Sequence, residues 1–181
     1  PALRDRLQVA TSELSRVSKI IRDYLDHTRA GKPSIVAADL RRLVEEAVRV
    51  TTSALRRPGI RIVTEIGAEA ATVQTDPGLL RQILINLLTN AIDATAAHQA
   101  DLGSGGPPTG RIFVSAKVVE DRIVLAVRDE GTGIPGEDLQ RIFEPFYTTK
   151  GRGRGTGLGL SICRELTRSL GGKITVESAP G

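Results

Sequence analysis

One segment constrains the fold more than any other: residues 77–99, PGLLRQILINLLTNAIDATAAHQ. Its apolar side chains recur at one-three-one-three spacing, which on an α-helix places them along one wide stripe. Asp76 suits the N-cap position before this helix, and Pro77 suits its first position, where a missing N–H does no harm. The pattern predicts a long helix with a buried stripe made of Leu79, Leu80, Ile83, Leu84, Leu87, Leu88, Ala91 and Ile92.

Helical and strand patterns are interleaved along much of the chain. Short runs rich in β-branched residues predict strands, and two of them, joined at Glu120-Asp121, predict a β-hairpin. This arrangement favours an α+β fold, a two-layer sandwich of mixed β-sheet and helices, over a doubly wound parallel sheet. We expect further helices over 38–55, 137–143 and 158–170, and strands over 60–67, 71–75, 111–119, 122–129 and 173–178.

Residues 1–30 carry a different pattern, a heptad whose apolar positions alternate spacings of four and three. Such a seam is typical of a long helix that packs against other helices in a coiled coil or bundle. Gly31 and Pro33 end it. We therefore expect a bundle-forming helix over 1–30, a linker over 31–37 and a separate domain over 38–181. The seam consists of Leu3, Leu7, Ala10, Leu14, Val17, Ile21, Tyr24 and Thr28.

The composition argues against several classes of protein. The single cysteine, Cys163, disfavours a disulfide framework, and the sequence lacks the ligand spacing of a structural zinc site. The net charge of +4 arises from basic residues scattered among acidic ones, and only 3% of residues are aromatic, so we expect no nucleic-acid binding. No apolar run has transmembrane length, so we expect no membrane contact by this chain.

Polar residues gather on one face of the helix expected over 77–99. Gln82, Asn86 and Asn90 are spaced by four, and Asp93 follows three positions later. A solvated helix face would explain the pattern, yet asparagine is mildly unfavourable inside a helix, and this pair lies beside the apolar stripe. Amide oxygens are hard, neutral ligands that suit a magnesium ion which keeps several waters and also binds phosphates.

Two glycine-containing stretches lie at the ends of expected elements. Asp129 ends a strand and is followed by Gly131 and Gly133, so its carboxylate could accept a hydrogen bond from an amine such as that of adenine. An ordinary tight turn would show the same residues. Residues 151–160, GRGRGTGLGL, lead into the helix expected over 158–170, and they fit either a flexible linker or a loop that presents backbone N–H groups to an anion.

Four stretches, taken in order, resemble the catalytic and ATP-binding domain of bacterial sensor histidine kinases, within the gyrase–chaperone–kinase–MutL ATPase superfamily. NLLTNAIDA (86–94) resembles the N box and DEGTGI (129–134) the first glycine box. FEPFYTTK (143–150) resembles the F box and GTGLGL (155–160) the second glycine box. The match spans about residues 38–181, and the helix over 1–30 is similar to the second helix of the family's dimerisation and phosphoacceptor hairpin.

The resemblance implies ATP and Mg²⁺ as cofactors and assigns roles to single residues. Asn90 would be the metal ligand, with Asn86 in support, and Lys150 would reach the phosphates; these three are the implied catalytic residues. Asp129 would bind the adenine amine, and residues 134–156 would form a mobile lid that Phe143 and Phe146 anchor. The other implied nucleotide contacts are Asp93, Gly131, Gly133, Ile134, Phe143, Arg154, Gly155, Thr156, Gly157, Leu158, Gly159 and Leu160.

The implied activity is transfer of the γ-phosphoryl group of Mg-ATP to a histidine and then to an aspartate in a response-regulator receiver domain. Neither His27 nor His98 is followed by an acidic residue, as in the family's acceptor motif, so the acceptor is expected outside this chain. The family's closing strand is also missing after residue 181. The resemblance further implies homodimerisation through the hairpin helices and a cytoplasmic location, with any membrane anchor upstream of Pro1.

Alternatives remain at this stage. The ATPase branches of the superfamily carry a water-activating glutamate at the position of Asn86, and an amide cannot take a proton at neutral pH, which favours a kinase. A nucleotide-dependent interaction module without phosphotransfer stays open because the acceptor motif is absent. An anti-sigma-type serine kinase shares the four motifs, and the heptad over 1–30 counts against it.

Overall fold

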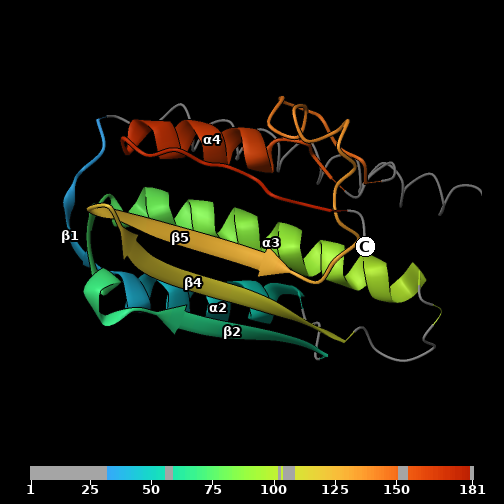
Figure 1. The fold of residues 1–181 in the computed structure, drawn as a ribbon, viewed down its shortest axis with the longest axis horizontal. Coiled ribbons are helices and arrows are strands. Elements are labelled where there is room, and N and C mark those ends of the chain that lie inside the picture. The colour runs from blue at the N-terminus through green and yellow to red at the C-terminus, as the bar shows by residue number, and fades with distance from the viewer. Residues whose placement is uncertain (1–31, 56–58, 102, 104–108, 151–154, 180–181) are drawn as a thin grey trace, which may run out of the picture.

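The computed structural model describes residues 32–55, 59–101, 103, 109–150 and 155–179. The bundle helix expected over 1–30 lies outside these residues. Helix α3, Pro77–Asp101, is the longest described element and confirms the helix expected from the apolar stripe (Figure 1). The other described elements are β1 Val36–Asp39, α2 Leu40–Leu55, β2 Ile60–Ile66, the 3₁₀ turn η1 Ala68–Ala70, β3 Thr72–Thr75, β4 Gly110–Val119, β5 Arg122–Asp129 and α4 Gly159–Ser169.

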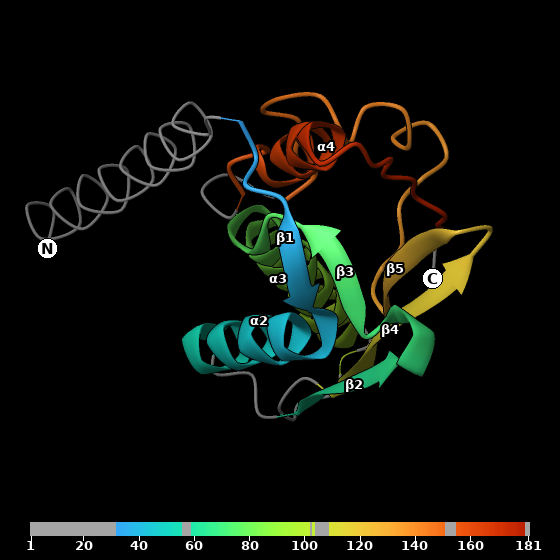
Figure 2. The same cartoon turned by 90° about the vertical axis from the view of Figure 1, so that its left-hand side faces the viewer.

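The strands form a mixed arrangement. β4 lies between β2, which runs parallel to it, and β5, which runs antiparallel, while β1 and β3 form a separate antiparallel pair. The β4–β5 hairpin turns on Glu120 and Asp121, whose φ angles of 48° and 60° match a tight two-residue loop. Helices α2 and α4 lie on opposite sides of α3, and the sheet is covered by helices on one face, which confirms the α+β sandwich (Figure 2).

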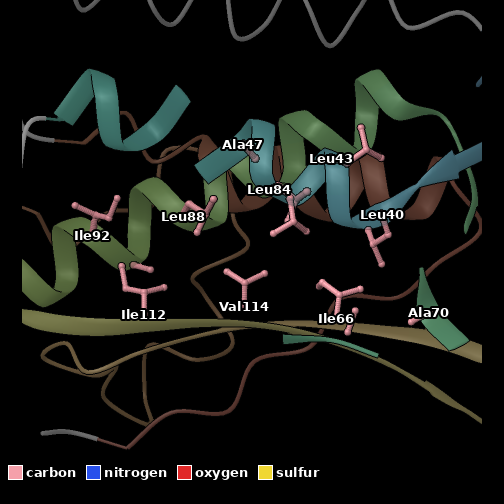
Figure 3. Packing of buried hydrophobic residues seen from close by; sticks show 13 residues of the cluster. Leu40, Leu43, Ala47, Ile66, Ala70, Leu84, Leu88, Ile92, Ile112 and Val114 are labelled. Carbon is pink, nitrogen blue, oxygen red and sulfur yellow. The ribbon is translucent and has the colours of Figure 1, made fainter. Parts of the chain in front are cut away.

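Apolar burial explains why α3 occupies the centre. Leu84 and Leu88, both fully buried, face Val114 of the sheet together with side chains of α2 (Figure 3). The neighbouring position Ile83 points to a second cluster, in which it packs against residues of α4. Because the stripe is wide, α3 contributes side chains to both clusters. The second cluster holds α4 and the residue before it next to the polar residues of α3.

Three expected details differ from the structure. Residues 137–143 form consecutive turns instead of a helix, and their backbone bonds are mostly of the tighter three-residue kind, as in Arg141 N–H to the Asp138 carbonyl. Residues 173–178 have no strand partner among the described residues, and strand propensity cannot supply one. Strand β1, which pairs with β3, contains Val36 and Ala37, expected in the linker, and also Ala38 and Asp39, expected in the helix.

Within the part of the chain that the structure describes, no helix combines the length and apolarity needed to cross a bilayer.

Candidate functional site

The polar face of α3 meets a lysine from a distant part of the chain. Lys150 Nζ donates to Asp93 Oδ2 at 2.8 Å and to Asn90 Oδ1 at 3.3 Å. Asp93 follows Asn90 by three positions, so the two side chains lie on one side of α3 and converge on the same ammonium group. The Asp93 and Lys150 side chains are 28% and 32% exposed, so solvent still reaches the pair.

A carboxylate and a glycine lie where β5 ends. Gly131 N–H donates to Asp129 Oδ1 at 3.0 Å, which turns the chain back toward α3. A Cβ atom on Gly131 would lie 2.6 Å from Ala94 Cβ, so only glycine fits between this turn and the helix. Desolvation by the surrounding protein raises the pKa of Asp129 although part of the residue is exposed, and the Gly131 bond partly offsets that effect. Among the described residues, no hydrogen bond reaches Asp129 Oδ2, so this oxygen can accept from an external donor.

The start of α4 forms the third side of the site. Gly159, its first residue, faces Asn90: a Cβ there would lie 3.6 Å from Asn90 Nδ2. Gly157 has a φ of +69°, and a Cβ there would lie 2.3 Å from the Phe146 carbonyl carbon. The Phe146 N–H donates to the Gly157 carbonyl at 2.9 Å, and this bond joins the F-box segment to the loop that immediately precedes α4. The α4 N-terminus carries no side-chain cap, so its first N–H groups are free to meet an anion.

Asn86 faces a different part of α4. The fully buried Cys163 thiol of α4 donates to the Ile83 carbonyl of α3 at 3.8 Å, and the Asn86 side chain lies close enough to lower the pKa of this thiol. Burial raises the pKa of Cys163 to about 12, and the Asn86 side chain offsets part of this effect. The thiol is therefore neutral and packs as a small apolar group. Cys163 thus joins α4 to α3 through the Ile83 carbonyl, beside Asn86 and one turn before Asn90.

The segment that follows the first glycine box, residues 135–147, contacts α4 through a side chain. Ile142 is buried, and the Phe143 ring lies under the Arg164 guanidinium of α4, 5.7 Å from ring centroid to carbon. The Tyr147 hydroxyl donates to the Asp138 carboxylate, which closes this segment on itself. Phe143 thus contacts the body of the domain and not the Asn90–Asp129 region.

The other residues expected to contact the nucleotide have different surroundings in the structure. Gly133 has a φ of +70°, and the Ile134 N–H donates to Ser178 Oγ at 2.9 Å. Leu158 is 8% exposed and packs in the second cluster, so its backbone and not its side chain borders the site. Thr156 Oγ1 accepts from Leu158 N–H at 3.4 Å. Leu160 is half-buried at the start of α4, whereas Arg154 lies outside the described residues.

The sequence expectations omitted Ala94, which shapes the site, and assigned Phe146 a different kind of contact. Ala94 allows the Gly131 turn to approach α3, and its signal was the small residue at the end of the N box. Phe146 is 67% exposed, so it joins the F box to Gly157 through its backbone and not through its ring. An aromatic residue in the sequence suggests a contact through its ring. Nothing in the sequence indicates that the backbone of Phe146 makes the contact instead.

The donor set fits a nucleotide with a bound metal. A carboxylate with an available oxygen suits an exocyclic amine, and an amide oxygen near a helix N-terminus and a lysine suits a metal–phosphate group. Among the described residues, no three His, Cys, Asp or Glu side chains gather to hold a metal. The amide of Asn90 is the hard ligand that this region offers, and the glycine-lined approaches supply the space.

The sequence is similar to those of known sensor proteins. The chain is 33% identical over 171 residues to the C4-dicarboxylate transport sensor protein DctB of Pseudomonas aeruginosa, covering 94% of this chain and 27% of DctB. The chain spans less than a third of the length of the first curated relatives it matches.

Solved structures share the fold. Full-length ShkA in complex with AMPPNP superposes with a TM-score of 0.73 at 27% identity, covering 90% of this chain and 33% of ShkA. Histidine kinase ThkA in complex with the response regulator TrrA gives a TM-score of 0.70 at 28% identity, covering 94% of this chain and 45% of that one. Residues 75–181, more than half of the chain, match the family of histidine kinase-, DNA gyrase B- and HSP90-like ATPases. The protein described here belongs to that family.

Proposed function

We propose that this chain is the ATP-binding kinase domain of a sensor histidine kinase. It binds Mg-ATP between α3, the end of β5 and the start of α4, and it transfers the γ-phosphoryl group to a histidine outside the chain. The observation that carries this proposal is the position of Asn90 beside Gly159, which brings an amide ligand and a helix N-terminus to one place. Backbone N–H groups and the helix dipole favour phosphate there.

Each residue of the site has a separate proposed role. Asp129 accepts a hydrogen bond from the adenine amine and so fixes the orientation of the base, because a partly desolvated carboxylate prefers a strong donor. Asn90 holds the metal through Oδ1, and Lys150 neutralises phosphate charge. The metal, when bound, supplies charge neutralisation at the phosphate oxygens. Asn86 lies beside Cys163 at the contact of α3 with α4 and cannot activate water, which favours phosphotransfer over hydrolysis.

The comparisons suggest the wider reaction. DctB is a sensor protein, and ThkA was solved with a response regulator. We therefore propose that a receiver-domain aspartate accepts the phosphoryl group from the histidine, that the intact protein forms a homodimer through its hairpin helices, and that this domain lies in the cytoplasm. Lys150, Asn86 and Asn90 are the proposed catalytic residues, and the other motif residues named above remain proposed nucleotide contacts, with Asp93 acting through Lys150.

Calorimetry tests nucleotide binding. We expect Mg-dependent ATP binding that weakens about 10- to 100-fold in Asp129→Ala, since a hydrogen bond to a charged group contributes about 1.5–3 kcal/mol. Asn90→Ala is expected to remove the dependence on Mg²⁺. Glu65→Ala, which removes an exposed carboxylate from β2, is the matched control and should bind ATP as the wild type does. Unchanged affinity in both site variants would exclude this site.

Phosphotransfer needs a second measurement. The chain is mixed with a longer form of the protein that carries the complete hairpin, and labelled ATP is added. We expect acid-labile, base-stable phosphate on the longer form, with transfer onward to a receiver domain. If ATP binds and no label appears, the chain is a nucleotide-dependent interaction module instead of a kinase.

A further inference from the structure

The ammonium group of Lys150 lies where the proposed metal would bind. It contacts Asn90 Oδ1, the proposed metal ligand, at 3.3 Å, and it contacts Asp93 more closely at 2.8 Å. Lys150 and Asp93 are separated by 57 positions in the chain, so this ion pair is a tertiary contact that closes the F-box segment onto α3. Asp93 makes the shorter of the two contacts and therefore determines where the ammonium lies.

The backbone around Lys150 is shaped for this position. A Cβ on Gly155 would lie 3.4 Å from Lys150 Cδ and 2.7 Å from Thr148 Oγ1. Thr148 Oγ1 also accepts from the Lys150 N–H at 3.2 Å. The lysine stem thus passes over a glycine, and both of its ends are fixed: the backbone by Thr148 and the ammonium by Asp93.

An ammonium and a magnesium ion cannot both occupy this position. A metal bound to Asn90 Oδ1 would lie within a few ångströms of Lys150 Nζ, and like charges at that distance in a partly desolvated site repel strongly. Phosphate oxygens would at the same time offer Lys150 a new anionic partner. Binding of Mg-ATP therefore requires Lys150 to exchange Asp93 for phosphate.

We infer that Asp93 is a positioning residue: it holds the Lys150 ammonium over Asn90 in the nucleotide-free protein, so Mg-ATP binds only by breaking this ion pair. The inference rests on the proposed function and goes beyond it, because Asp93 then acts on the nucleotide through Lys150 and not by direct contact. The strength of the pair sets part of the ATP affinity. It also couples nucleotide binding to release of the F-box segment from α3.

A double-mutant cycle tests this inference by calorimetry with Mg-ATP. We expect Asp93→Asn to strengthen Mg-ATP binding about threefold, the fold-change that corresponds to a partly exposed ion pair of about 0.7 kcal/mol. In a Lys150→Met background the same substitution should give no gain, because no pair remains to be broken. Asp93→Glu should restore the wild-type affinity. If Asp93→Asn strengthens binding equally in both backgrounds, simple repulsion of phosphate explains it, and the inference fails; weaker or unchanged binding in the wild-type background also overturns it.

Hydrogen exchange without nucleotide gives an independent readout. Amides of residues 146–150 should exchange about threefold faster in Asp93→Asn and in Lys150→Met, and Mg-ATP should produce the same increase in the wild type. Glu46→Gln is the matched control, because Glu46 also pairs with a residue of α3, Arg81 at 3.2 Å, away from the site. Unchanged exchange in both site variants contradicts the inference. Absence of Mg-ATP binding to the wild type would instead contradict the proposed function and leave the exchange test standing.

Discussion

At the scale of single residues, the site depends on where side chains are absent. Gly131 lies 2.6 Å, measured to its hypothetical Cβ, from both Ala94 Cβ and Asp129 Oδ1, and 2.8 Å from the Ala94 carbonyl carbon. Backbone atoms of a buried helix cannot move aside cheaply. The contact between the end of β5 and α3 therefore requires glycine, and the same contact positions the Asp129 carboxylate.

Gly131→Ala tests this requirement. The added methyl group must separate the turn from α3, so we expect a loss of about 1–3 kcal/mol in the free energy of unfolding. Urea denaturation measures it. Gly136→Ala, in the same segment but with nothing within 4 Å of its Cβ, is the control and should stay within about 0.5 kcal/mol of the wild type. Equal effects of the two substitutions would show that space at Gly131 is not limiting.

At the scale of elements, the start of α3 is fixed by one carboxylate. Asp76 accepts from the N–H groups of Gly78 at 2.9 Å and Leu79 at 3.1 Å, and its second oxygen accepts from Ser34 N–H at 2.9 Å. Burial alone would raise the pKa of Asp76, but the three backbone donors outweigh it and lower the pKa below its usual value. The ionised cap thus joins the segment before β1 to the helix that carries Asn90.

Asp76→Ala should lower the free energy of unfolding by about 1 kcal/mol at neutral pH. Because the pKa of Asp76 is lowered in the folded state, the stabilisation from its charge is complete above the usual carboxyl pKa and is lost as pH falls through the folded value. The difference in the free energy of unfolding between the wild type and Asp76→Ala should therefore become smaller at acidic pH. Denaturation series at several pH values measure this, with Asp76→Asn as the uncharged acceptor control. A gap that stays constant with pH would contradict the ionised cap.

The elements differ in how far the sequence could predict them. α3 was predictable because its stripe and its cap agree, and the β4–β5 hairpin because two alternating runs meet at a two-residue turn. Residues 137–143 and 173–178 were predicted wrongly because short segments take their conformation from tertiary partners, such as the Asp138–Tyr147 contact. β1 was missed because its partner, β3, lies far along the chain. The Lys150–Asp93 pair could not be predicted for the same reason, because the two residues lie far apart in the sequence. The motifs of the candidate site could be proposed from short stretches of sequence.

At the scale of the whole molecule, α3 divides the interior into two apolar clusters. The larger one joins α2, α3 and the sheet, and the smaller one joins α3 to α4 through Ile83, Ile162 and Leu166. The smaller cluster also includes Leu158, just before α4. Few buried side chains hold α4, so we expect α4 to open at a lower free energy than the sheet. The proposed phosphate-binding helix end is attached to the less stable part of the domain.

Leu166→Ala and Leu88→Ala test this division, since Leu166 is 2% exposed in the smaller cluster and Leu88 is fully buried in the larger one. Each should cost about 2–5 kcal/mol, because a buried leucine leaves a cavity. Hydrogen exchange should distinguish them: Leu166→Ala should speed exchange mainly in Gly159–Ser169 and weaken Mg-ATP binding, whereas Leu88→Ala should speed exchange throughout the domain. Mg-ATP, if it contacts the start of α4, should restore protection there in Leu166→Ala. Identical exchange patterns in the two variants would mean that the clusters unfold as one cooperative unit, and α4 could then not respond to nucleotide independently of the sheet.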